Sequence, residues 1–169
     1  MRRGFSLIEF MIVLLIFSII MGSVFSVMTV SKTSWYSGST QIEVQQETRR
    51  GMDRMVKELR QTNPTKITGV PANGTPYNSI SFRLSVVDAN GNTTWSSTIN
   101  YSLGGLNNQQ ILRTENSQQE VLANNIINLQ FERSVSTSNV LEINLLSQKS
   151  IILGHNIGTS LTSQIKLRN

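Results

Sequence analysis

The sequence predicts an α+β protein in which a long N-terminal helix precedes a small antiparallel β-sheet. Two observations support this prediction: residues 10–30 are uncharged and mostly apolar, and the hydrophobic period changes from 3.6 to 2 residues after Thr65. The first pattern is typical of a helix surrounded by lipid or by other helices, and the second of strands with one covered face. A chain of 169 residues therefore predicts one domain with an N-terminal appendage.

The N-terminal segment predicts a single membrane-spanning helix. Residues 10–30 are 21 uncharged positions, about 31 Å of helix at about 1.5 Å per residue, which matches a hydrocarbon core of roughly 30 Å. A conventional signal peptide has a shorter apolar region before a small-residue cleavage site, so this length favours an anchor. Arg2 and Arg3 form a positive end, which predicts a cytoplasmic N-terminus and a C-terminal portion outside the cytoplasm.

Glu9 is the one charged residue between Phe5 and Val30. A carboxylate toward the bilayer centre costs on the order of 2.5–3.5 kcal/mol, so Glu9 either stays at the headgroups or takes a positive partner. If the chain were cut between Gly4 and Phe5, the new α-amino group would lie about one helical turn before Glu9, on the same chain or on a neighbour. The residues alone leave both alternatives open.

The helix is expected to continue beyond the membrane to residue 62. Residues 32–62 contain no proline, and Ser37-Gly38-Ser39 marks a site for a bend. Asn63-Pro64 ends the segment, because a residue before proline is pushed out of the helical region. The residues that recur at three- and four-residue steps, and so predict an apolar stripe, are Val44, Thr48, Met52, Met55, Val56 and Leu59. This stripe is expected to cover one sheet face.

Alternating apolar and polar residues predict the strands of the sheet. Residues 80–86 and 95–103 form a hairpin around a turn at residues 88–92. Further strands are expected at residues 111–114, 127–133, 140–146 and 161–167, with Ile127, Leu129 and Phe131 facing one way, and Leu141, Ile143 and Leu145 facing one way. We therefore expect a globular β-sheet domain at residues 64–169.

The charged residues of the chain do not predict a nucleic-acid partner, although the net charge is +5. The basic residues Arg49, Arg50, Arg54, Lys57 and Arg60 are interspersed with Glu47, Asp53 and Glu58. Asp53 with Lys57 and Arg54 with Glu58 have the i,i+4 spacing of helical ion pairs. This pattern predicts a solvated, salt-bridged helix face.

The supply of catalytic groups is poor, so we expect no enzyme, no cofactor and no metal. His155 is the one histidine and cysteine is absent, which leaves neither an imidazole cluster nor thiolate ligands. The order of Asp88, Asn90 and Asn92 is similar to the start of a calcium loop, but the glycine is Gly91 and the twelfth position is Ile99. We interpret residues 88–92 as a turn.

The run Arg2-Arg3-Gly4-Phe5-Ser6-Leu7-Ile8-Glu9, followed by an unbroken apolar segment, resembles the start of type IV prepilins and of the pseudopilins of type II secretion. The resemblance implies that residues 1–4 are a leader, with Arg2 and Arg3 as its charge. A prepilin peptidase would cut after Gly4 and N-methylate the new first residue, Phe5. It also implies that Glu9 neutralises the N-terminus of a neighbouring subunit during filament assembly.

The same resemblance implies the partners and the location of the protein. The partners are other pilins or pseudopilins packed helix to helix, the peptidase, an inner-membrane assembly platform and membrane lipid. The protein would cross the inner membrane once at residues 5–31, continue as an extramembrane helix over residues 32–63, and then enter a periplasmic or cell-surface filament. Residues 50–61, 122–131 and 167–169 are similar to J-type pseudopilins and W-type minor pilins, which implies a minor subunit of the complex that initiates the filament at its tip.

The sequence therefore leaves two alternative classes of function. The first is a minor pilin or pseudopilin, a structural subunit of the filament. The alternative is a single-span, membrane-tethered extracytoplasmic binding module, adhesin-like, whose sheet recognises a ligand and whose N-terminus only anchors it. A mature chain that begins at N-methylated Phe5 distinguishes the first from the second.

Overall fold

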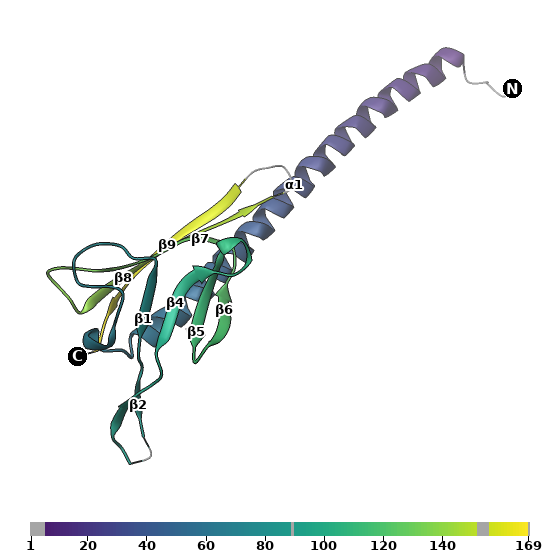
Figure 1. Ribbon diagram of the computed structural model, residues 1–169. Coiled ribbons are helices and arrows are strands. Elements are labelled where there is room, and N and C mark those ends of the chain that lie inside the picture. Colours follow the sequence, from purple (N-terminus) through teal and green to yellow (C-terminus); the bar gives the residue numbers. More distant parts are fainter. Residues whose placement is uncertain (1–5, 89, 152–155, 169) are drawn as a thin grey trace. The chain divides into compact units, whose positions relative to one another are not determined.

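The computed structural model describes residues 6–88, 90–151 and 156–168 (Figure 1). Residues 1–5, among them Arg2, Arg3, Gly4 and Phe5, lie outside the described residues, and so does His155. The chain divides into two compact units, Met1–Ser39 and Thr40–Asn169, which are described separately. One long helix followed by antiparallel sheets confirms the predicted α+β class.

The helix α1 covers Leu7–Leu59, and Ser37-Gly38-Ser39 is α-helical within it. It ends three residues earlier than predicted, because the amides of Gln61 and Thr62 bond to the carbonyls three residues before them. The 3₁₀-helix η1 (Pro64–Lys66) follows, and the Asn63 side chain caps it by accepting from the Thr65 amide at 2.9 Å.

The nine strands of the described residues are all paired antiparallel, and they lie in two sheets and a ribbon where the sequence predicts one sheet. The first sheet has the order β1 (Ser79–Phe82), β4 (Ile99–Gly104), β5 (Gln110–Glu115), β6 (Gln118–Ala123). The second sheet has the order β7 (Ile126–Arg133), β8 (Val140–Ser150), β9 (Asn156–Lys166), and the ribbon pairs β2 (Ser85–Val87) with β3 (Thr93–Trp95). The 3₁₀-helix η2 (Leu106–Asn108) connects β4 to β5.

The predicted hairpin is present, but it is interrupted. β1 pairs with β4 and β2 pairs with β3, so the ladder is broken between them. At the break the Leu84 amide bonds to the Ser96 hydroxyl, at 2.9 Å, and the Thr62 hydroxyl donates to the Arg83 carbonyl at 2.7 Å. The ribbon β2–β3 extends away from the first sheet in Figure 1.

Three details of the strands differ from the prediction. Ile127 is 39% exposed while Ile126 is buried, because the register shifts between Ile126 and Asn128, so the prediction that Ile127 faces the same way as Leu129 and Phe131 is wrong. β6 is not predicted by the pattern, since most of its side chains are exposed and do not alternate. β9 also begins before Leu161, at Asn156, in pairing with the extended end of β8.

The apolar stripe of α1 packs against strands, as predicted, but against two sheets instead of one, and its member Val56 is only partly buried. Met55 and Leu59 are fully buried, and Val44, Thr48 and Met52 are buried too. These α1 residues share one cluster with residues of both sheets, among them Ile80, Phe82, Tyr101, Leu129, Phe131, Ile143 and Ile165. A glycine is required within this interface, because a Cβ added to Gly51 would lie 2.9 Å from the Cβ of Ala123.

A buried line of hydrogen bonds also joins α1 to the second sheet. The Thr48 hydroxyl lies 2.8 Å from the Ser147 hydroxyl of β8, which lies 3.2 Å from the Thr159 carbonyl of β9. The Thr48 hydroxyl also lies 2.6 Å from the Val44 carbonyl within α1. Burial of these polar groups is tolerated because each one has a partner.

Candidate assembly segment

The start of α1 is organised around Ser6 and Glu9. The Glu9 amide donates to the Ser6 carbonyl at 3.1 Å and to its hydroxyl at 3.3 Å, so Ser6 caps the helix. A serine followed three residues later by a glutamate is the capping-box pattern, and the carboxylate lies in the first turn, where the helix dipole favours negative charge. Our sequence reasoning missed this cap, although the Ser-x-x-Glu spacing signals it.

The apolar side chains that follow are exposed on every side of the helix. Leu7 is 80% exposed and Phe25 71%, and none of the most apolar stretch is buried. By length and composition α1 is able to cross a membrane. Because each Å² of apolar surface left in water costs roughly 25 cal/mol, such a segment needs lipid or other helices around it.

The hydroxyl groups of this segment bond to the helix backbone. Ser18, Ser23, Thr29 and Thr33 each donate to the carbonyl four residues earlier, over 2.7–3.2 Å. In hydrocarbon no water is present to receive these donors, so internal bonding lowers the cost of placing them there.

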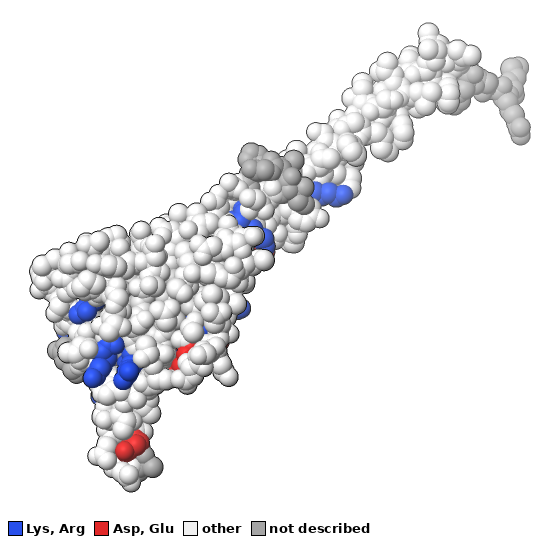
Figure 2. Space-filling view, in the orientation of Figure 1, with Lys and Arg blue, Asp and Glu red and all other residues white. Residues whose placement is uncertain are grey.

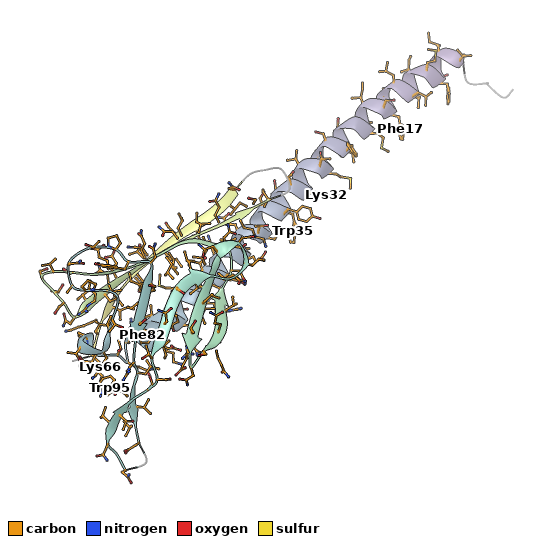
Figure 3. The ribbon with its side chains drawn as sticks, in the orientation of Figure 1. Phe17, Lys32, Trp35, Lys66, Phe82 and Trp95 are labelled. Carbon is orange, nitrogen blue, oxygen red and sulfur yellow. The ribbon has the colours of Figure 1, made fainter. Side chains whose placement is uncertain are left out.

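The apolar segment ends at a group of residues typical of a membrane interface. Lys32 is the first charged residue after Glu9. Figure 3 labels it together with Trp35, and the face of the apolar segment drawn in Figure 2 is white up to the first basic atoms. Trp35 is 75% and Tyr36 57% exposed. Lysine snorkels toward headgroups and aromatic rings gather at that depth, so residues 32–36 resemble an aromatic belt, a signal that our sequence reasoning also missed.

Three carboxylates in the C-terminal half of α1 bond to strands or turns of the second unit. The Glu43 carboxylate lies 2.6 Å from the Lys149 ammonium of β8. Glu47 accepts from the Asn124 amide at 2.8 Å and from its side chain at 3.1 Å. Asn124 precedes Asn125, whose φ of 59° turns the chain between β6 and β7. The spacing alone predicts that Glu47 lies on the solvated face of the helix. Its side chain instead bonds to Asn124, in the turn between β6 and β7.

Glu58 is the most buried of these carboxylates, at 7% exposure. It accepts from the Tyr101 hydroxyl at 2.7 Å, from Arg113 Nε at 3.1 Å and from Arg54 Nε at 2.7 Å. Burial, and then the bond to Glu58, raise the pKa of Tyr101 well above its ordinary value, so the hydroxyl stays a donor. The predicted Arg54–Glu58 pair is confirmed, but Glu58 faces the first sheet rather than solvent.

The remaining predicted contacts have mixed outcomes. No ion pair joins Asp53 to Lys57 among the described residues, so that pair is not formed. The Asp88 carboxylate accepts from the amides of Asn90 and Asn92, at 2.9 and 2.8 Å, and so closes the turn of the ribbon. Within residues 6–88, 90–151 and 156–168, no three His, Cys, Asp or Glu side chains are grouped as metal ligands.

Comparison with known families finds one match. Residues 1–25 match the family model described as the prokaryotic N-terminal methylation motif. No curated protein and no solved structure matches the chain significantly. The apolar, uncovered start of α1 agrees with a single membrane anchor. The match supports an N-terminus of the prepilin type at residues 1–25, the segment that prepilin peptidase processes in type IV pilins and pseudopilins.

Proposed function

We propose that the protein is a minor pilin or pseudopilin, a structural subunit whose N-terminal helix packs with those of other subunits in a filament. The uncovered apolar surface of residues 7–30 supports this most directly, because it surrounds the helix and has Glu9 as its one charge. The role as a minor subunit draws support from residues 50–61 and 122–131. These two segments, which resemble minor subunits, contact each other where Gly51 meets Ala123.

The processing step depends on residues outside the described range. We propose that prepilin peptidase removes the leader with Arg2 and Arg3 by cutting after Gly4, and that Phe5 is then N-methylated. The Phe5 amine would lie four residues before Glu9. In the membrane, the amine of one subunit would pair with Glu9 of an incoming subunit, which lowers the cost of the buried carboxylate.

The same proposal places the parts of the chain relative to the membrane. Residues 5–31 cross the inner membrane, residues 32–63 continue outside it, and residues 64–169 form the outer β domain, with the N-terminus cytoplasmic. The interface-like residues 32–36 support the boundary after residue 31. The assembly platform of the inner membrane then incorporates the subunit at the tip or start of the filament.

Mass spectrometry of the protein from its native host tests the processing. We expect a chain that begins at N-methylated Phe5, and a Gly4→Leu variant that retains the leader. A wild-type chain that keeps Met1 would contradict the proposal and favour the membrane-tethered binding module.

Substitution of Glu9 tests the assembly mechanism. We expect Glu9→Val and Glu9→Gln to insert into the membrane normally and to be lost from filaments purified with a tagged subunit. Ser6→Ala is the matched control, because it removes the helix cap and keeps the carboxylate. Normal incorporation of both Glu9 variants, or an equal loss with Ser6→Ala, would overturn the pairing mechanism.

A further inference from the structure

A small pocket lies where three parts of the second unit meet. It has a volume of about 200 Å³ and is lined by Gln61, Asn63, Ser85, Thr93, Trp95 and Arg168. Backbone bonds hold its walls, since the Ser85 amide donates to the Gln61 carbonyl at 3.3 Å and the Arg168 amide to the Thr62 carbonyl at 3.1 Å. The pocket is therefore built by the turn after α1, the ribbon β2–β3 and the segment after β9.

The pocket offers hydrogen-bonding groups that the fold does not use. The side chains of Gln61, Ser85 and Thr93 make no hydrogen bond within the part of the chain that the structure describes. The side-chain oxygen of Asn63 accepts from the amide and the hydroxyl of Thr65, and its side-chain nitrogen has no partner among the described residues. Two amides and two hydroxyls thus line one small space.

The charged side chains that the described residues place at the pocket are basic. Arg168 lines it, and Lys66 Nζ lies 5.3 Å from the ring centroid of Trp95. Neither cation takes part in the four ion pairs of the described residues, and no acidic side chain lines the pocket. Figure 2 shows basic atoms gathered at the base of the ribbon, where Figure 3 labels Lys66 and Trp95.

We propose that this pocket binds one carboxylated sugar ring of an acidic polysaccharide. Trp95, 37% exposed, offers indole surface for the apolar side of the ring, while the amides and hydroxyls bond to the sugar hydroxyls. The carboxylate pairs with Arg168, and Lys66, beside the Trp95 ring, adds positive charge next to the pocket. Pockets for drug-sized ligands have roughly 300–1,000 Å³, so this smaller one suits a single ring with its chain continuing outside.

The composition of the lining favours a sugar over a nucleic acid. Four uncharged polar side chains and one arginine match a ligand with several hydroxyl groups and a single negative charge. A nucleic acid presents a row of phosphates, whose neutralisation takes several cations along a track. The proposal goes beyond the filament role, and it does not depend on processing, because the pocket belongs to the second unit.

Tryptophan fluorescence tests the proposal in the full chain. The protein has two tryptophans, so Trp35→Phe leaves Trp95 as the reporter. In detergent, we expect oligogalacturonate to change the fluorescence of Trp95 saturably, and the same oligomer with its carboxyl groups reduced to alcohols to bind at least tenfold more weakly. The unprocessed and processed chains are expected to bind equally, so failure of the filament role leaves this result unchanged.

Arg168→Gln in the Trp35→Phe background identifies the site. We expect the affinity for oligogalacturonate to fall at least tenfold, with the circular dichroism spectrum unchanged, since the Arg168 backbone bond is kept. Arg49→Gln is the matched control, because it removes an exposed cation that lies on α1 and does not line the pocket. It should change the affinity less than twofold. Absence of saturable binding, equal effects of both variants, or tighter binding of an oligodeoxynucleotide would each overturn the proposal.

Discussion

The two halves of α1 contain similar apolar residues in opposite environments. Met28, in the first half, is 54% exposed, while Met55, in the second, is fully buried against the sheets. The difference follows from the pattern, because the first half is apolar all round and the second only along one stripe. A stripe is covered by the chain's own strands, whereas an apolar surface on all sides requires lipid or other subunits.

Polar groups differ between the halves in the same way. In the first half, Ser18 and Thr33 bond to carbonyls of their own helix. In the second half, Glu47 and Glu58 bond to Asn124, Tyr101 and Arg113, which belong to other elements. Substitutions in the second half should therefore change the stability of the isolated subunit, and those in the first half its assembly.

The largest effect on stability is expected for Glu58→Ala. Removing this buried carboxylate leaves the Tyr101 hydroxyl without its acceptor and Arg113 with Glu115 as its remaining carboxylate partner, so we expect a loss of about 3–5 kcal/mol of unfolding free energy. Glu43→Ala is the control, because its pair with Lys149 is solvent-exposed and contributes about 0–1 kcal/mol. Urea denaturation of the full chain in detergent measures both, and similar losses would show that Glu58 does not connect α1 to the first sheet.

Methionine truncation compares the halves directly. Met55→Ala leaves a cavity in the core, so we expect a loss of about 2–5 kcal/mol. Met28→Ala should change the unfolding free energy by less than about 0.5 kcal/mol, because its side chain is exposed in the subunit. The same denaturation measurement distinguishes them, and a large effect of Met28→Ala would mean that the first half is covered within the subunit.

Two glycines of α1 make a third comparison. Gly51→Val should cost about 1–3 kcal/mol, since even a Cβ lies 2.9 Å from that of Ala123. Gly38→Ala has no neighbour within 4 Å, so we expect a gain of up to about 1 kcal/mol from higher helix propensity. Thermal unfolding followed by circular dichroism measures the pair; equal shifts in Tm would contradict the close contact of α1 and β6.

The smallest effect is expected from pH. The hydroxyl of Ser97, and then Arg113, lower the pKa of Glu115 below 4.5, and Gln164 and Asn144 lower that of Glu142. The unfolded chain then takes up protons first as the pH falls, so this part of the stability is present above about pH 5 and is lost below it.

Matched amide variants separate these two groups from other acids. Unfolding free energies from pH 7 to pH 3 should fall less steeply in Glu115→Gln and Glu142→Gln than in the wild type. An unchanged slope in both variants would show that neither carboxylate contributes to the acid sensitivity.

Much of the fold could be predicted from periodicity. The stripe of Met52, Met55 and Leu59 and the alternation of Leu141, Ile143 and Leu145 place those residues in the core, because burial follows spacing in regular elements. Ile127 could not be placed, since a bulge reverses the face of a side chain without a change in composition. β6 was not predicted because most of its side chains are exposed, so its sequence shows no alternation of apolar and polar residues.

The candidate sites divide in the same way. Glu9 and the apolar segment are local in sequence, so their arrangement is readable from spacing. The partners of Glu58 are 43 and 55 residues away, and the pocket at Trp95 joins residues of the turn after α1, the ribbon and the C-terminal segment. Only tertiary packing brings such residues together, and no sequence motif predicts their contacts.

The bonds from Thr48 through Ser147 to Thr159 have a mechanical consequence. A pull applied along α1 reaches β8 and β9 together at this point, so the load is shared between two strands instead of peeling one. With no cysteine in the chain, no disulfide takes that load. Resistance to tension must then come from hydrogen bonds and packing that break in parallel around the second half of the helix.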